Sequence, residues 1–251
     1  MNIKMIVTDL DNTLLRHDKT VSEYTVDVFK RIRKRGLLLA FATARDFRFV
    51  TEYIVPLTGI NPDILIAANG ALARYNGKDL YKKMIPYSTV SVLMQHFGSV
   101  RCVSTENTYY LSDEYANDHW SIGKRNTVIT DFKNAIENDA FYLDGNADKQ
   151  ALPEKNHDIR IVTYSDVSIV SIVHREATKL NALITTGNVL NIKKDDIIVF
   201  GDDYSDIELL SNYNNSIAVS NAINECKKAA KYICDSNEND GVARWLEENV
   251  L

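Results

Sequence analysis

The chain has 251 residues, of which 45% are hydrophobic and 25% are charged, and its formal net charge is −5. These proportions are ordinary for a soluble globular protein, and the length allows one large domain or two smaller ones. The mild negative charge argues against a basic surface for nucleic acid or for an anionic membrane, so we expect neither partner. Small phosphorylated molecules stay possible, because local Lys and Arg side chains can outweigh a mildly acidic surface.

The cysteines indicate a reducing compartment. Cys102, Cys226 and Cys234 are widely spaced and form no Cys-x-x-Cys pair, which indicates neither a disulfide framework nor a zinc site. No apolar run reaches the ~20 residues of a membrane span, and the N-terminus leads directly into the first expected strand, which leaves no room for a signal peptide. We therefore expect a cytoplasmic protein, either a monomer or a weak homodimer.

The first part of the chain alternates strands and helices. Short apolar runs rich in β-branched residues predict buried strands at residues 5–7, 37–42 and 63–67. Helices are expected between them, from about 20 to 34 and from about 46 to 55. This alternation is typical of a parallel, doubly wound sheet.

Local signals mark where the two helices begin and end. Thr20 and Glu23 fit a capping box at the start of the first helix, and Gly36 follows its basic last turn as a stop. The second helix is expected to begin near Asp46 and to end before Pro56, because proline cannot donate the backbone hydrogen bond of a helix interior.

The pattern changes after residue 70. Asn76-Gly77 between apolar segments predicts a hairpin with a type I′ turn. From about Lys82 short helices and short strands follow, and several neighbouring strands are expected to be antiparallel. The expected strands are 100–104, 140–143, 159–164 and 167–173, and the expected helices lie near 88–97, 112–123, 131–138 and 146–151. We interpret residues 82–173 as a separate α+β module inserted into a loop of the first domain.

The doubly wound pattern resumes after His174. The expected elements are a helix at 175–184, a strand at 196–200, a helix to about 210, a strand at 216–219, a helix at 221–228, a strand at 232–233 and a helix at 241–249. Residues 1–81 and 174–251 should therefore form one domain.

Two carboxylates follow the first strand. Asp9 and Asp11 are spaced two apart and precede Thr13, and ligands in open α/β sheets bind just past the carboxyl ends of strands. In extended chain, side chains two apart point to the same side. Two carboxylates that face one small volume repel each other unless a cation or a shared proton relieves them, and Mg²⁺ is the obvious relief. An acidic turn is the alternative for this motif alone.

Other polar groups stand at later strand ends and helix starts. Thr43 follows the second strand, Lys179 lies in the helix after the insert, and Asp202 and Asp206 follow the apolar strand at 196–200. Two leading carboxylates, a hydroxyl, an ammonium and further carboxylates suit phosphoryl transfer. A carboxylate can attack phosphorus, a cation and Lys can neutralise the phosphoryl oxygens, and backbone N–H groups at a helix start can hold the rest.

These motifs resemble the haloacid dehalogenase superfamily of phosphotransferases. The resemblance is carried by Asp-Leu-Asp-Asn-Thr at 9–13, Phe-Ala-Thr-Ala-Arg at 41–45, a Lys after the insert and Gly-Asp-Asp-Tyr-Ser-Asp at 201–206. Asn69-Gly70-Ala71, Ser220-Asn221-Ala222 and Asp240-Gly241-Val242-Ala243 look like the Cof-type branch, which carries a large α+β cap. The resemblance implies a Rossmann-like doubly wound core with an inserted cap, and a Mg²⁺-dependent phosphatase acting on a small phosphorylated metabolite such as a sugar phosphate.

The resemblance also implies a role for each residue. Asp9 would be the nucleophile that becomes phosphorylated, and Asp11 would protonate the leaving oxygen and then activate water. Thr43 and Lys179 would bind the phosphoryl group. Asp202 would hold Mg²⁺ with Asp9 and the backbone carbonyl of Asp11. The supporting positions are Asp206, which would buttress Lys179 or the water shell of the metal, and Asp203, Ala44 and Asn69.

Structural interpretations stay open for several of these residues. Thr43 could be an N-cap, Lys179 a solvated helix lysine, and Asp202 and Asp203 an acidic turn. For Arg45 a structural ion pair is at least as good an interpretation as a substrate contact.

The chain departs from the family at Ala44 and Ser220, where the family usually has Gly, and at Ser205, where it usually has Asn. None of these changes removes a catalytic group.

Two other functions fit the same residues. A sugar phosphomutase shares the nucleophile and a similar cap, and would return the phosphoryl group to a sugar instead of water. A non-catalytic phospho-receiver or binding protein also clusters acidic residues with a Lys. Receiver domains, however, lack Asp-x-Asp-x-Thr at the first strand and have no inserted cap.

Overall fold

The computed structural model describes residues 3–96, 100–115, 126–132, 136–146 and 158–251. Packing divides the chain into two compact units. We call Met1–Tyr81 with Thr178–Leu251 the core unit and Lys82–Ala177 the inserted unit. The second junction follows Ala177 and not Val173, because the last strand of the inserted unit continues to His174 and the Arg175 N–H then bonds the Asp158 carbonyl (2.8 Å).

The core unit is built on an eight-stranded sheet of order β14-β13-β12-β1-β2-β3-β4-β5. Its parallel strands are β1 (Met5–Thr8), β2 (Leu38–Ala42), β3 (Ile64–Ala67), β12 (Ile197–Gly201), β13 (Asn215–Val219) and β14 (Tyr232–Cys234). The antiparallel hairpin β4 (Leu72–Tyr75) and β5 (Lys78–Lys82) extends one edge. Asn76 and Gly77 both have positive φ, 48° and 73°, as the predicted type I′ turn requires.

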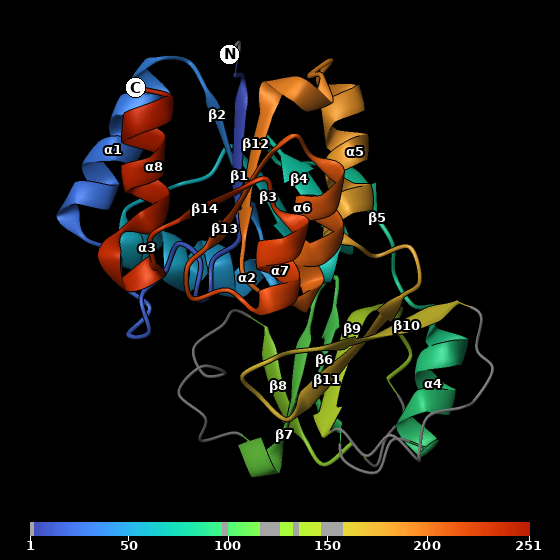
Figure 1. Ribbon diagram of the computed structural model, residues 1–251. Helices are drawn as coiled ribbons and strands as arrows, with labels where there is room; N and C mark the ends of the chain where they lie inside the picture. The colour runs from blue at the N-terminus through green and yellow to red at the C-terminus, as the bar shows by residue number, and fades with distance from the viewer. Residues whose placement is uncertain (1–2, 97–99, 116–125, 133–135, 147–157) are drawn as a thin grey trace. The chain divides into compact units, whose positions relative to one another are not determined.

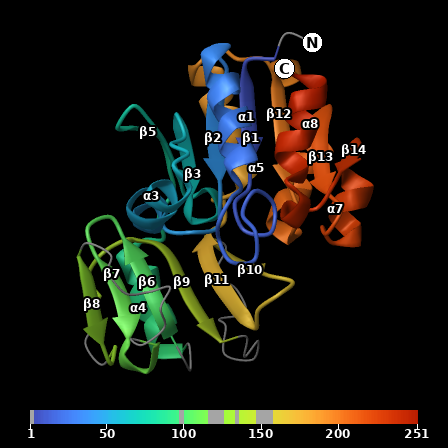
Figure 2. The ribbon, with the colours of Figure 1, turned by 90° about the vertical axis from the view of Figure 1, so that its left-hand side faces the viewer.

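Helices cover both faces of this sheet (Figures 1 and 2). Helices α1 (Glu23–Lys34) and α8 (Gly241–Asn249) lie side by side on one face, while α5 (Lys179–Val189), α6 (Ile207–Asn212) and α7 (Asn224–Ala229) lie on the other. The parallel strands other than the edge strand β14 are almost fully buried, which explains their continuous apolar runs. The predicted doubly wound parallel sheet is confirmed.

The inserted unit contains a six-stranded sheet of order β10-β11-β9-β6-β7-β8. The strands are β6 (Val100–Thr105), β7 (Tyr109–Ser112), β8 (Thr127–Thr130), β9 (Ala140–Asn146), β10 (Ile159–Thr163) and β11 (Ile169–His174). All neighbours are antiparallel except β7 and β8. Helix α4 (Tyr87–His96) contributes Val90 and Leu93 to a core shared with strand residues Val103, Leu143 and Ile172.

Two helix boundaries predicted within residues 1–81 are wrong. Helix α1 begins at Glu23, and the Ser22 hydroxyl, not Thr20, accepts the capping bond, from the Thr25 N–H (3.0 Å). The second helix does not end before Pro56. Its first turn α2 (Phe47–Phe49) passes through a π-helical stretch at 50–54 into α3 (Val55–Thr58), and the wider turn lets the Val55 N–H bond the Val50 carbonyl just before the proline.

Strands β7 and β8 of the inserted unit were not predicted. Residues 112–115 form the end of β7 and a short 3-10 turn, not a helix, and 116–123 lie outside the described residues. The described part of the expected helix at 131–138 is irregular. Asn146 ends β9, and the rest of the expected helix at 146–151 lies outside the described residues.

Candidate active site

The polar groups singled out in the sequence follow adjacent strands. Asp9 comes directly after β1, Thr43 after β2 and Asp202 after β12, and β1 pairs in parallel with both neighbours. The chain order reverses at β1, since β2 and β3 lie on one side and β12 and β13 on the other. Such a switch point is where open α/β sheets bind ligands.

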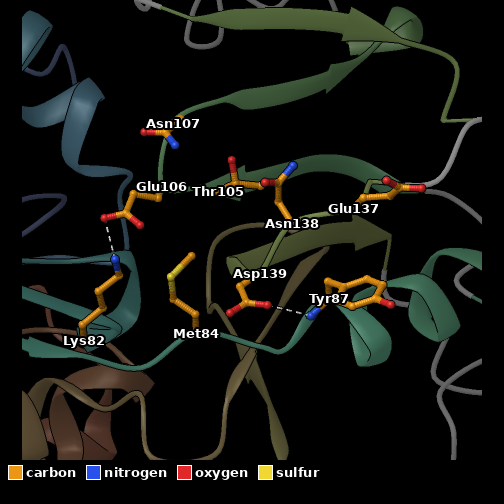
Figure 3. A pocket seen from close by; sticks show the side chains of 9 residues that line it. All are labelled: Lys82, Met84, Tyr87, Thr105, Glu106, Asn107, Glu137, Asn138 and Asp139. Carbon is orange, nitrogen blue, oxygen red and sulfur yellow. Dashed lines mark hydrogen bonds and ion pairs between the residues drawn. The ribbon is translucent and has the colours of Figure 1, made fainter.

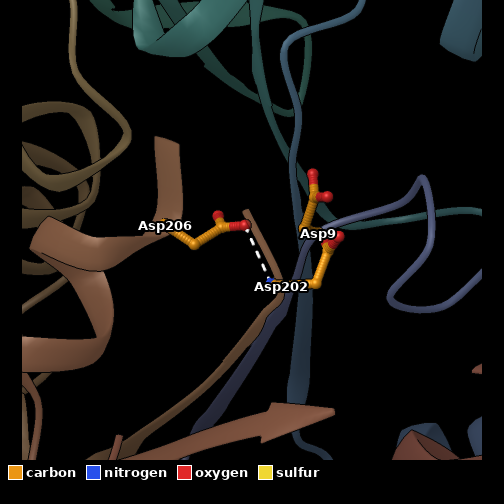
Figure 4. Close-up of side chains that lie close together, drawn as sticks. All are labelled: Asp9, Asp202 and Asp206. Carbon is orange, nitrogen blue, oxygen red and sulfur yellow. Dashed lines mark hydrogen bonds between the residues drawn. The ribbon is translucent and has the colours of Figure 1, made fainter. Parts of the chain in front are cut away.

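A cluster of three carboxylates occupies this place (Figure 4). One oxygen from each of Asp9, Asp202 and Asp206 lies within 4.8 Å of the others, and all three residues are buried. The Thr13 hydroxyl donates a hydrogen bond of 2.5 Å to Asp202 Oδ1. This contact of Thr13 was not predicted, although Thr13 belongs to the Asp-Leu-Asp-Asn-Thr motif.

Lys179 supplies the positive charge inside this cluster. Its Nζ donates to Asp9 Oδ1 (2.9 Å) and to Asp206 Oδ1 (2.8 Å), and the residue is only 2% exposed. Lys179 is the first residue of α5, and the Thr178 hydroxyl caps the helix by accepting from the Asn181 N–H. The predicted helix start at Arg175 is therefore wrong, because residues 175–177 form a turn that the Ala177 N–H closes on the His174 carbonyl (2.8 Å).

Asp206 is fixed as firmly as Lys179. Its second oxygen accepts from the backbone N–H groups of Asp202 (3.1 Å) and Asp203 (3.3 Å). The last residue of β12 makes room for this carboxylate, since a Cβ on Gly201 would lie 2.5 Å from the side-chain carbons of Asp206. Gly201 is therefore a site residue in a steric sense, and its place directly before Asp202 was the signal available in the sequence.

A second close approach brings Lys179 to the strand ends. Ala68, Asn69 and Gly70 all have positive φ, and a Cβ on Gly70 would lie 2.2 Å from the carbonyl carbon of Thr178. Only glycine allows this contact between the turn after β3 and the start of α5. The Asn69 N–H also bonds the Thr43 carbonyl (3.2 Å), so this turn links the ends of β2 and β3 to Lys179.

The Asp11 carboxylate is not part of this three-carboxylate cluster and pairs with two cations. Arg45 Nε and Nη2 donate to its two oxygens at 2.7 and 2.8 Å, and Lys19 Nζ donates to Oδ1 at 2.7 Å. The structure thus assigns Arg45 an ion pair with Asp11. Burial alone would raise the pKa of Asp11, but the charges of Arg45 and Lys19 outweigh it and hold that pKa well below its usual range.

Burial dominates in the cluster itself, so the net pKa shifts of its two carboxyl groups Asp9 and Asp202 are upward. It raises the pKa of Asp9 to about 7, although Lys179 counteracts it, and the charges of Asp206 and Asp11 add to the rise. Burial, with the neighbouring charges of Asp9 and Asp206, raises the pKa of Asp202 to about 9. For Lys179, burial favours the neutral form, but the two carboxylates outweigh it and raise its pKa.

The charge balance of the cluster fits a hard cation. Three buried carboxylates share one ammonium, and the described partner of the Asp202 carboxylate is a neutral hydroxyl. Carboxylate oxygens are the ligands that Mg²⁺ prefers, and an added divalent charge would relieve the repulsion that raises the pKa values of Asp9 and Asp202. The cluster can therefore bind a metal ion.

The remaining predicted residues surround these groups. Thr43 is buried, and its hydroxyl accepts from the Arg45 N–H (3.1 Å). Ala44 lies between them and is partly exposed. Asp203 caps the turn that presents Asp206 and stays outside the carboxylate cluster, so its described role is structural.

The loop after β1 is held from the far end of the chain. The Asn221 side chain donates to the Asn12 carbonyl (2.7 Å), and Asp240 accepts from Arg16 (3.2 Å), Ser22 (2.8 Å) and Thr25 (3.0 Å). The segments at 220–222 and 240–243 therefore support the loop that carries Asp11 and Lys19.

The inserted unit has a pocket of its own, of about 380 Å³ (Figure 3). Three carboxylates are among the residues that line it. Glu106 pairs with Lys82 (2.5 Å), and Asp139 accepts from the Tyr87 N–H at the start of α4 (2.9 Å). All three carboxylate residues are exposed, and the contacts of Glu106 and Asp139 are made within the inserted unit.

Comparisons with known proteins agree with this site. A profile of the haloacid dehalogenase-like hydrolase family matches residues 6–246. The 5-amino-6-(5-phospho-D-ribitylamino)uracil phosphatase YitU of Bacillus subtilis is 24% identical, over 97% of this chain and 96% of its own. Among solved structures, the subclass IIB sugar phosphatase BT4131 superposes with a TM-score of 0.81 at 20% identity, and 98% of each chain is covered. A Cof-like hydrolase from Plasmodium vivax superposes with a TM-score of 0.84 at 20% identity, over 98% of this chain and 95% of its own.

Fold and site together define a hydrolase with a buried carboxylate cluster at the switch point of a doubly wound sheet. The chain belongs to the haloacid dehalogenase-like hydrolase family. The class predicted from the motifs, a phosphatase of this type with a Cof-type cap, is confirmed. Among the described residues, no helix is long and apolar enough to cross a membrane.

Proposed function

We propose that the protein is a Mg²⁺-dependent phosphatase that hydrolyses a small phosphorylated metabolite through an aspartyl-phosphate on Asp9. The observation that carries the proposal is the buried Asp9 carboxylate, which Lys179 holds at 2.9 Å inside a cluster with Asp202 and Asp206. A fixed carboxylate beside an ammonium and a cation site is what in-line attack on phosphorus requires.

Asp9, Asp202 and the backbone carbonyl of Asp11 would hold Mg²⁺. When bound, the ion would neutralise charge on the phosphoryl oxygens and on the carboxylates that surround them. Lys179 would bind the phosphoryl group from its place between Asp9 and Asp206. The Thr43 hydroxyl would bind a further phosphoryl oxygen at the end of β2.

In the first step a carboxylate oxygen of Asp9 forms a bond to phosphorus while the bond from phosphorus to the ester oxygen breaks. Asp11 gives its proton to the departing oxygen. Arg45 and Lys19 oppose protonation of Asp11, but the negative charges of the substrate phosphoryl group raise the pKa of Asp11 in the complex. In the second step water attacks phosphorus, Asp11 takes its proton, and Asp9 is released with free phosphate.

The inserted unit would act as the cap that selects the leaving group, closing over the substrate to exclude water. The relatives support small phosphorylated substrates, since one is named for a phosphoribitylamino-uracil and a structural neighbour is named a sugar phosphatase. Hydrogen exchange tests this role: the segments around Lys82 and Ala177 should change protection when a phosphate mimic binds, and identical protection would count against closure.

The function itself is tested with a panel of phosphate esters, including sugar and polyol phosphates. Free phosphate should be released in the presence of Mg²⁺, and its release should stop in excess chelator. Asp9→Asn should abolish turnover, because an amide is nearly isosteric but cannot attack phosphorus. The exposed Asp27→Asn serves as the matched control and should keep full activity. Isomerised sugar phosphate in place of free phosphate would indicate a mutase, and full activity of Asp9→Asn would refute the assignment.

A further inference from the structure

Lys19 has an unusual backbone for a lysine. Its φ is +67°, in the left-handed region that favours Gly or Asn, and this conformation is strained for a residue with a side chain. The surrounding loop maintains it: the Lys19 N–H bonds the Arg16 carbonyl (2.9 Å), and the Arg16 N–H bonds the Thr20 carbonyl (3.0 Å). A side chain that is kept at this cost calls for a functional explanation.

The side chain of Lys19 reaches the group that acts on protons in the proposed reaction. Its ammonium lies 2.7 Å from Asp11 Oδ1, and the Lys19 side chain is only 16% exposed, so solvent screens this pair weakly. Asp11 has about four lone pairs, and Arg45 Nε, Arg45 Nη2 and Lys19 Nζ engage three of them. The three donors fix the plane of the carboxylate and leave one direction for the proton of the reaction.

The loop that carries Lys19 is itself anchored. The Arg16 guanidinium donates to both oxygens of Asp240 (3.2 Å each), and Asp240 also accepts from Ser22 and Thr25 at the start of α1. The ammonium is therefore presented by a rigid segment and not by a free surface loop.

We propose that Lys19 is a positioning residue, which holds the Asp11 carboxylate in the orientation that proton transfer needs. The inference rests on the proposed function. This role differs from that of a surface lysine, which would affect neither turnover nor Asp11. It also differs from that of a substrate-binding lysine, because Lys19 contacts Asp11.

The test compares Lys19→Gly with the unaltered protein. Glycine suits the left-handed backbone, so the melting temperature should stay the same or rise, while kcat should fall about tenfold or more with KM within about twofold, as expected for a misoriented acid–base group. n-Butylammonium, which replaces the missing cation, should restore part of kcat, whereas n-butanol should not. In an Asp11→Asn background the Lys19→Gly change should lower turnover no further.

Asn191→Gly is the matched control, because Asn191 is also left-handed (φ 52°) and exposed but lies outside the site, and its kcat should not change. If Lys19→Gly keeps kcat within about twofold of the unaltered protein, the inference is overturned and the proposed function stands. A rise in KM with unchanged kcat would also overturn it. So would an equal loss of turnover when Lys19→Gly is added to Asp11→Asn. If the unaltered protein releases no phosphate from any ester, both fail.

Discussion

Lys179 is buried, although the sequence left open that it is a solvated lysine on a helix surface. It lies buried between Asp9 and Asp206, so removing its charge leaves two buried carboxylates without their cation. Lys179→Met should lower the free energy of unfolding by about 3–5 kcal/mol and kcat/KM by about 10²–10³, measured by urea unfolding and steady-state kinetics. The exposed Lys228→Met should change stability by less than about 0.5 kcal/mol. A Lys179→Met protein as stable as the control would contradict this account.

Residue types and their order were enough to place Asp9, Thr43, Lys179 and Asp202 at one edge of the sheet. The direction of each side chain was not available from the sequence. The ion pair of Asp11 with Lys19 depends on the left-handed backbone of Lys19, and the sequence does not show which lysine adopts that conformation.

At the scale of elements, apolar runs located the core strands, but helix starts were less reliable. The helix after the insert was expected from Arg175, but it begins at Lys179. Ile184 is 45% exposed, while Leu183 is fully buried. Lys179 is the first residue of this helix and is buried. Because the buried face of a helix is recognised in the sequence by its apolar residues, a buried lysine does not show where that face begins.

Gly70 tests how α5 is positioned. An Ala at this position would bring its Cβ to 2.2 Å from the Thr178 carbonyl carbon and would also adopt φ +87°. Gly36, with φ +78° and no atom within 4 Å of such a Cβ, is the matched control. Gly36→Ala should cost about 1–2 kcal/mol, whereas Gly70→Ala should cost more and should also lower kcat/KM by moving Lys179. Equal losses of stability and full activity in both variants would show that the close approach is unimportant.

At the scale of the whole molecule, the carboxylate cluster links stability to pH and metal. The pKa values of Asp9 and Asp202 in the folded protein lie above their ordinary values, at about 7 and about 9. Their contribution to stability is therefore present at low pH and lost as pH rises through these values. Mg²⁺ should reverse that loss, so it should raise the melting temperature more at about pH 8 than at about pH 5.5. Equal shifts at both pH values, measured against chelator, would argue against metal binding by these carboxylates.

The change of pattern near residue 82 predicted where the inserted unit begins. In the structure the inserted unit extends to Ala177. The insert was harder to read than the core. Strand β8 has no buried residue, and β7 alternates buried with partly exposed residues. Neither strand therefore has the continuous apolar run by which the core strands were recognised, and both were missed. The prediction of a monomer or weak homodimer stays a prediction.

The proposed mechanism depends on a phosphoryl group carried by Asp9. Borohydride reduces an acyl phosphate to an alcohol, so quenching the reacting enzyme with borohydride should convert the phosphorylated aspartate to homoserine. Mass spectrometry of the tryptic peptide from Met5 to Arg16, which contains both Asp9 and Asp11, should then find homoserine at position 9 only when Mg²⁺ and a substrate ester are present. Homoserine at position 11, or an unmodified peptide from an enzyme that is releasing phosphate, would contradict the account.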